Sequence, residues 1–96
     1  MRESAFERYA VEKIKSSGAR AFKWVCPGMT GAPDRIAVFP GGRIVFIEFK
    51  RPGRKEGMSE RQKKVGKLLE SLGCAVYRIG NKEKFKKMME DYGYEV

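Results

Sequence analysis

Apolar residues recur along this chain with two spacings, one typical of amphipathic helices and the other typical of strands. Helical spacing occurs near both ends of the chain and again after residue 59, and short apolar runs lie between these segments. The pattern predicts a helix from Ser4 to about residue 16, strands at 21–25, 34–39 and 43–50, a helix at 59–72, a strand at 75–79 and a helix after Asn81. This αβββαβα order predicts an α/β fold with a mixed central β-sheet flanked by helices, in one domain spanning residues 1–96.

Two of the predicted helices begin at capping residues. Ser4 is followed three residues later by Glu7, and Ser59 is followed by Gln62, and both pairs match the capping-box pattern. The helix at 59–72 also carries an apolar stripe that we expect to face the core, formed by Val65, Leu68, Leu69 and Leu72.

The strand at 43–50 contains two charged residues within an apolar run. Glu48 and Lys50 point to the same face, because side chains two residues apart on a strand lie on one side of it. The Pro-Gly-Gly sequence at 40–42 predicts a tight turn, which places Asp34 opposite Glu48 on the neighbouring strand. Two adjacent carboxylates suit Mg²⁺, and a lysine beside them suits charge stabilisation at a phosphodiester. These residues therefore indicate metal-dependent phosphodiester chemistry.

The same residues also allow a structural interpretation. Glu48 and Lys50 could neutralise each other as an ion pair, and Asp34 could cap its loop through its side chain. From the residues alone, both interpretations remain open.

The charge of the chain indicates a polyanionic partner. Lys and Arg number 21 against 12 Asp and Glu, a net charge of +9. Residues 50–67 hold eight Lys or Arg and two Glu, a net +6, whereas residues 82–96 are balanced. We expect phosphate contacts from the basic residues of the first segment: Arg51, Arg54, Lys55, Arg61, Lys63 and Lys64.

Several classes of protein are disfavoured by composition. The chain has no histidine, and its two cysteines, Cys26 and Cys74, do not form a CxxC motif, so a structural zinc site is not expected. The longest apolar run is 44–47, far short of the roughly 20 residues needed to cross a bilayer, and the N-terminus has no apolar signal region. We expect a cytoplasmic protein.

The segment GAPDRIAVFPGGRIVFIEFKRPG, followed by SERQKK, resembles the VRR-NUC family of restriction-endonuclease-like nucleases, stand-alone versions of which occur in phages and bacteria. The resemblance covers essentially the whole chain and implies a Mg²⁺- or Mn²⁺-dependent DNA endonuclease. It also implies a role for each matching residue.

By this resemblance, Asp34 and Glu48 would hold the metal ion with the backbone carbonyl of Phe49, and Lys50 would be the catalytic lysine. Gln62 would face the site from the following helix, a role compatible with its capping box. The family also uses a glutamate from the first helix, for which Glu7 is the best match and Glu3 the alternative.

Two other functions compete with the nuclease. A catalytically inactive nucleic-acid-binding module would use the basic segment alone, but acidic residues beside a phosphate path would oppose its binding. A basic protein-interaction domain would need an exposed apolar stripe, which the pattern does not predict.

Family analogy further suggests a homodimer acting on branched DNA such as a four-way junction, since two cuts related by symmetry need two sites. We expect the dimer face on the first helix, which carries Phe6 and Tyr9, and on the C-terminal segment DYGYEV.

Overall fold

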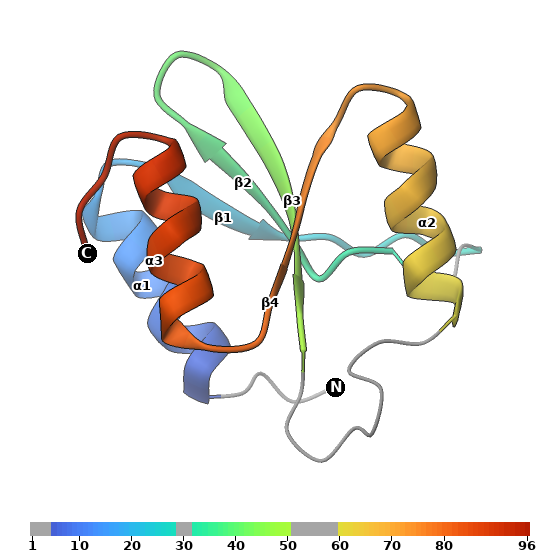
Figure 1. The fold of residues 1–96 in the computed structure, drawn as a ribbon, viewed down its shortest axis with the longest axis horizontal. Helices are drawn as coiled ribbons and strands as arrows, with labels where there is room; N and C mark the ends of the chain where they lie inside the picture. Colours follow the sequence, from blue (N-terminus) through green and yellow to red (C-terminus); the bar gives the residue numbers. More distant parts are fainter. Residues whose placement is uncertain (1–4, 29–31, 51–59) are drawn as a thin grey trace.

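The computed structural model of the chain describes residues 5–28, 32–50 and 60–96 (Figure 1). Its elements follow the predicted order: α1 (Ala5–Ser16), β1 (Arg20–Lys23), β2 (Arg35–Phe39), β3 (Arg43–Phe49), α2 (Glu60–Ser71), β4 (Ala75–Ile79) and α3 (Lys82–Asp91). The largest difference is at β1, which ends at Lys23 instead of residue 25. Ser4 and Ser59, the two predicted capping residues, lie outside the described residues.

The four strands form one sheet in the order β1-β2-β3-β4. The first three strands are antiparallel, whereas β4 runs parallel to β3, and α2 makes the crossover between them. Gly41 and Gly42 both have positive φ angles, 89° and 76°, which the tight turn between β2 and β3 requires. This turn sets the register of the hairpin, with Arg35 opposite Ile47.

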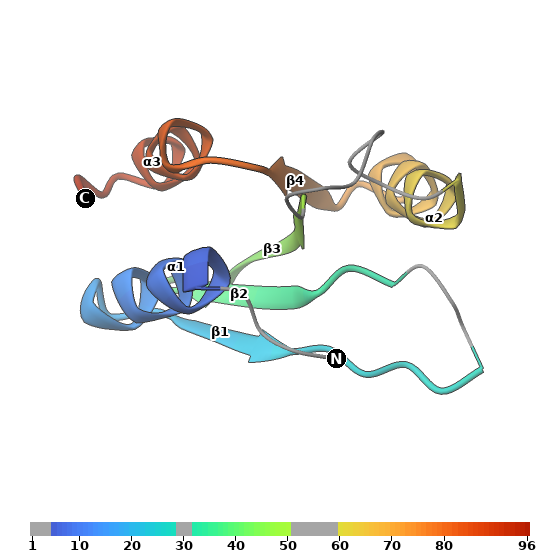
Figure 2. The ribbon, with the colours of Figure 1, turned by 90° about the horizontal axis from the view of Figure 1, so that it is seen from below.

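The helices lie on opposite sides of the twisted sheet. Figure 2 shows α1 and α3 together on one side of β3 and β4, with α2 on the other. The core is formed between the sheet and the α1/α3 pair, by Ala10, Ile14, Ala19, Ala37, Phe39, Val45, Ile47, Phe49, Ile79, Phe85, Met88 and Met89. Alternation along β3 therefore turns Ile47 and Phe49 towards this core and Glu48 towards the α2 side.

The apolar stripe predicted for α2 does not face the core. Gly66 is the buried residue of this helix, while Leu68 and Leu72 are 51% and 71% exposed. A Cβ atom at Gly66 would lie 2.5 Å from Nη2 of Arg78 on β4. The helix therefore packs on the sheet through its glycine, and this orientation turns the two leucines outward. An exposed apolar surface, which the sequence pattern did not predict, is thus present.

The aromatic residues expected at a dimer face contribute to the fold of the monomer instead. Phe6 contacts Phe49, Tyr9 contacts Phe85, and Tyr94 stacks on Phe39, with ring centroids 5.9, 5.8 and 5.6 Å apart. All three pack against the core cluster. These rings are partly buried in the monomer, which reduces the apolar surface that α1 and the C-terminal segment offer to a second copy.

In the part of the chain that the structure describes, no helix is long and apolar enough to cross a membrane.

Candidate active site

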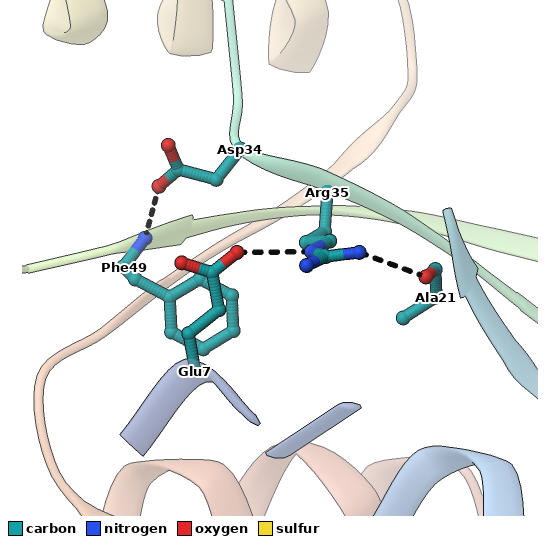
Figure 3. A network of polar contacts seen from close by, with 5 residues as sticks. All are labelled: Glu7, Ala21, Asp34, Arg35 and Phe49. Atoms are coloured by element: carbon teal, nitrogen blue, oxygen red, sulfur yellow. Dashed lines mark hydrogen bonds and ion pairs between the residues drawn. The ribbon is translucent and has the colours of Figure 1, made fainter. Parts of the chain in front are cut away.

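Asp34 and Glu48 come together where β2 begins and β3 ends. The ladder pairs Arg35 with Ile47, and one further step of the same register places Asp34 opposite Glu48, as the turn at 40–42 predicted. Oδ2 of Asp34 accepts a hydrogen bond of 2.8 Å from the backbone N–H of Phe49 (Figure 3). This bond fixes the aspartate against the end of β3, beside Glu48.

Glu48 is a buried carboxylate without a hydrogen bond. Glu48 is 0% exposed, and neither of its side-chain oxygens has a hydrogen-bond partner among the described residues. Burial, which disfavours the charged form, raises the pKa of Glu48 from 4.5 to about 7. The guanidinium of Arg78 opposes this rise, while the charges of Asp34 and Glu70 add to it.

A cation bound at this position would satisfy the unpartnered oxygens of Glu48. Buried charges in proteins are normally paired or coordinate a metal, since an isolated charge is strongly unfavourable. Two carboxylates from neighbouring strands form a hard-oxygen donor set, which suits Mg²⁺ or Mn²⁺. The residues present therefore fit the divalent ion that the sequence predicted.

Among the described residues, Arg78 forms an ion pair with Glu48, a contact that sequence reasoning missed. Its Nε lies 3.9 Å from Oε2 of Glu48, and its Nη2 lies 3.2 Å from Oε1 of Glu70, with which it is hydrogen-bonded. The parallel ladder pairs Glu48 with Arg78, and this pairing could not be read from the sequence. An arginine within the apolar strand 75–79 was the available clue.

Lys50 follows the end of β3, on the same face as Glu48 by strand alternation. Its N–H donates a 2.8 Å hydrogen bond to the carbonyl oxygen of Ile79, which extends the pairing of β3 with β4. A Cβ atom at Gly80 would lie only 3.3 Å from Cβ and Cδ of Lys50, so Gly80 leaves room for the lysine stem. The ion pair between Lys50 and Glu48 that the sequence allowed does not occur in the described part of the chain. Glu48 pairs with Arg78 instead.

Glu7 comes from α1, on the side of the sheet opposite to α2. It is 2% exposed, and its Oε2 accepts a hydrogen bond of 2.9 Å from Nε of Arg35, which also reaches the carbonyl of Ala21 (Figure 3). Arg35 points to this side because it follows Asp34 by one residue on the strand. Within residues 5–28, 32–50 and 60–96, no three acidic, histidine or cysteine side chains could share a metal ion. Glu7, Asp34 and Glu48 thus do not form the three-carboxylate set that the resemblance implied.

We expect Glu7→Gln to lower the free energy of unfolding by about 3 kcal/mol, because breaking one partner of a buried ion pair leaves the other charge uncompensated. Urea denaturation measures this change, and Glu12→Gln, an exposed position on the same helix, is the matched control. Manganese affinity should stay unchanged in both variants. Weaker manganese binding by Glu7→Gln without loss of stability would instead identify Glu7 as a metal ligand.

The remaining predicted residues lie on or before α2. Gln62 is half-buried in the first turn of the helix, Arg61 and Lys64 are exposed, and Lys63 lies 3.9 Å from the carboxylate of Glu60. Arg51, Arg54 and Lys55 lie outside the described residues, as does Glu3, the alternative to Glu7.

Comparison with known proteins supports the resemblance. No family model matches the chain. The chain is 42% identical over 55 residues to the "Putative nuclease p44" of Acyrthosiphon pisum secondary endosymbiont phage 1, a match that covers 57% of this chain. The chain spans 59% of the length of that curated relative.

A solved structure described as a VRR_NUC domain is also similar, with a TM-score of 0.79 and 28% sequence identity over 90% of this chain and 91% of the other. The predicted resemblance and the predicted fold class are therefore confirmed.

Proposed function

Since this chain has the fold of the VRR-NUC domain, we propose that it is a metal-dependent endonuclease that hydrolyses phosphodiester bonds in DNA. The observation that carries the proposal is the carboxylate of Glu48, which is buried without a hydrogen bond among the described residues, opposite Asp34 and two residues before Lys50. A carboxylate buried in this way destabilises the fold unless it binds a cation.

Each residue of the site has a distinct role in this proposal. Asp34 and Glu48 hold a divalent ion, with the carbonyl of Phe49 as a further oxygen ligand. When bound, the ion supplies Lewis-acid stabilisation of the phosphate and lowers the pKa of a water molecule. The ammonium of Lys50 stabilises the negative charge that develops on the phosphate during attack. Gln62, in the first turn of α2, faces the site from the same side of the sheet as Glu48.

The competing proposal is a nucleic-acid-binding module without catalysis. Such a protein would gain nothing from two carboxylates beside a phosphate path, since they repel DNA. The arrangement of Asp34 and Glu48 favours the nuclease for this reason.

We expect DNA cleavage to require a divalent metal, because two carboxylates facing a phosphodiester repel it unless a cation lies between them. Excess chelator should abolish the activity measured with Mg²⁺ or Mn²⁺. Calorimetric titration with Mn²⁺ should show saturable binding that Asp34→Asn removes and that Glu83→Gln, an exposed carboxylate on α3, retains. Full activity in excess chelator would disprove the two-carboxylate site.

DNA would be held by the basic segment before and within α2. In the described part of this segment, Arg61 and Lys64 are exposed on α2 and Lys63 is half-buried. Arg51, Arg54 and Lys55 complete the proposed set. We further propose a cytoplasmic location, which for a phage-encoded protein would be the cytoplasm of the bacterial host.

We include in the proposal a homodimer that acts on branched DNA. The dimer face is placed at the C-terminal end of α2, where Leu68 and, directly after the helix, Leu72 are exposed one helical turn apart, beyond the basic residues of the first turns. A two-fold dimer would present two sites, as paired cuts in a four-way junction require.

Sedimentation at micromolar protein in moderate salt should show a dimer of the 11.0 kDa chain. Replacing both Leu68 and Leu72 by serine should yield monomers, because the apolar contact is lost. Val25→Ser, at a position outside α2 that is 74% exposed, is the control. A monomeric wild-type protein would contradict the dimer, and nicking without paired cuts would contradict the junction substrate.

A further inference from the structure

A groove lies between β4 and α3, with a volume of about 280 Å³. Tyr77, Ile79 and Met88 form much of its lining, and Lys84, Lys87 and Asp91 contribute charged groups from α3. Arg78 also borders it. The groove is thus largely apolar inside, with ionic groups along the helix.

The charge of the groove is positive because Arg78, Lys84 and Lys87 outnumber Asp91 in its lining. Oδ2 of Asp91 accepts a hydrogen bond of 3.0 Å from the hydroxyl of Tyr77. Burial and this hydrogen bond raise the pKa of Tyr77, which therefore stays a neutral donor. The guanidinium of Arg78 is bonded to Glu70. Lys84 and Lys87 have no acidic partner within the described residues, so two ammonium groups remain available to an anion.

The groove is linked to the candidate active site through the end of β4, although α3 lies on the opposite side of the sheet from α2 and Glu48. Ile79, in its lining, accepts the hydrogen bond from the backbone N–H of Lys50, and the next residue, Gly80, packs against the Lys50 stem. Asn81 then caps α3 by accepting a hydrogen bond of 2.9 Å from the N–H of Lys84. Figure 1 shows that β3 and β4 finish at the same end of the sheet, the lower end in this view, and that α3 begins at that end. A strand of DNA leaving Lys50 along α3 would reach Lys84 first and Lys87 one turn later.

We infer that this groove binds the phosphate backbone of DNA next to the cleaved bond, through Lys84 and Lys87. The inference rests on the proposed nuclease function and adds a contact surface separate from the basic segment before and within α2. Lysine ammonium groups bind phosphate as point charges, and the two positions are neighbours on one helix face. The apolar lining can pack against the sugars.

The fold separates charges that cancel in the sequence. Residues 82–96 have no net charge in sum. Lys84 and Lys87 nevertheless both line the groove, whereas Lys86 does not. Lys82 instead lies over the ring of Tyr9, 4.6 Å from its centroid. The balanced composition of α3 therefore does not argue against a phosphate contact on this one face.

The test compares the double variant Lys84→Gln/Lys87→Gln with the matched control Lys15→Gln/Lys86→Gln, which loses the same charge at exposed positions outside the groove. Fluorescence anisotropy with a labelled four-way junction and a labelled duplex, in chelator, measures DNA affinity from 50 to 200 mM salt. Single-turnover cleavage with Mn²⁺ measures the chemical step at saturating protein. Thermal unfolding verifies that both variants are folded.

Losing two phosphate contacts should reduce the slope of log affinity against log salt by about 2. Between 50 and 200 mM salt, the DNA affinity of the wild type should therefore fall about tenfold more than the affinity of the groove variant. The control should keep the wild-type slope. Cleavage at saturating protein should stay within about twofold of wild type in the control, whose two lysines lie outside the groove and the candidate active site.

Equal slopes for the groove variant and the control, in a protein that binds and cuts DNA, would overturn the groove and leave the nuclease standing. A reduced slope for the groove variant in a protein that binds DNA but never cuts it would support the groove as a DNA contact and overturn the nuclease.

Discussion

Replacing Glu48 by glutamine is expected to abolish cleavage and, at the same time, to make the metal-free protein more stable. Cleavage is lost because a neutral amide is a far weaker ligand for a hard divalent ion than a carboxylate. Stability rises because the wild-type carboxylate is fully buried without a hydrogen bond. These opposite effects would identify Glu48 as a residue kept for function at the expense of stability.

The size and pH dependence of the stability effect follow from the pKa of Glu48. Burial raises this pKa from 4.5 to about 7 in the folded protein, so the unfolded chain loses this proton at lower pH. Below pH 4.5 the carboxyl is protonated in both the folded and the unfolded state, and it does not lower the free energy of unfolding. As the pH rises, the buried charge lowers this free energy progressively, and the full loss is reached above pH 7. A shift of this size corresponds to about 3 kcal/mol above pH 7.

Thermal unfolding in excess chelator measures this prediction. At pH 8 the midpoint for Glu48→Gln should exceed that of wild type by on the order of 10 °C. The difference should shrink towards pH 4.5, where the wild-type carboxyl is protonated. Glu83→Gln, at an exposed carboxylate on α3, serves as the control. A Glu48→Gln variant less stable than wild type at pH 8 would show that the pairing with Arg78 outweighs the desolvation of the carboxylate.

Replacing Lys50 by methionine is expected to reduce the rate of cleavage by about 100-fold or more, the effect of losing one group that stabilises transition-state charge. Methionine keeps an unbranched stem that can occupy the space beside Gly80. The hydrogen bond to Ile79 is made by the backbone and is therefore retained. The substitution thus removes the ammonium group with little change to its surroundings.

Single-turnover cleavage with saturating Mn²⁺ and DNA measures the chemical step directly. Manganese affinity and DNA affinity should both change by less than about threefold, since Lys50 is proposed to act on the reacting phosphate. Lys50→Ala tests the same charge without the stem, and Lys67→Met, an exposed lysine on α2, is the control. A cleavage rate equal to that of wild type would assign Lys50 a purely structural role.

Local patterns in the sequence were sufficient to predict the elements and the hairpin. The strand at 75–79 has the predicted bounds, and the other predicted elements are present with small differences at their ends. The Pro-Gly-Gly turn fixed the register that places Asp34 opposite Glu48, because a tight turn leaves few ways to pair the residues that flank it. The two carboxylates could be paired from sequence for this reason.

Contacts between elements distant in the sequence were decided by the tertiary structure alone. Arg78 lies beside Glu48 because β4 pairs with β3 in a parallel register, which depends on the path of α2 and not on a short turn. Glu7 pairs with Arg35 because α1 packs on the face of the sheet opposite to Glu48. Helical spacing could not reveal this choice, since it shows that a helix has an apolar face but not which side of the sheet receives it.

The surfaces of α2 and α3 show the same limit. The leucine stripe of α2 predicted burial, yet Gly66 allows the closest approach to the sheet and leaves Leu68 and Leu72 exposed. The charges of α3 cancel in the sequence, but its packing on β4 places Lys84 and Lys87 together at the groove. The sequence by itself thus determined which elements form and which carboxylates face each other across the hairpin. Packing between elements determined the partners of these carboxylates and the character of each surface, because such contacts depend on how the helices dock and not on spacing along the chain.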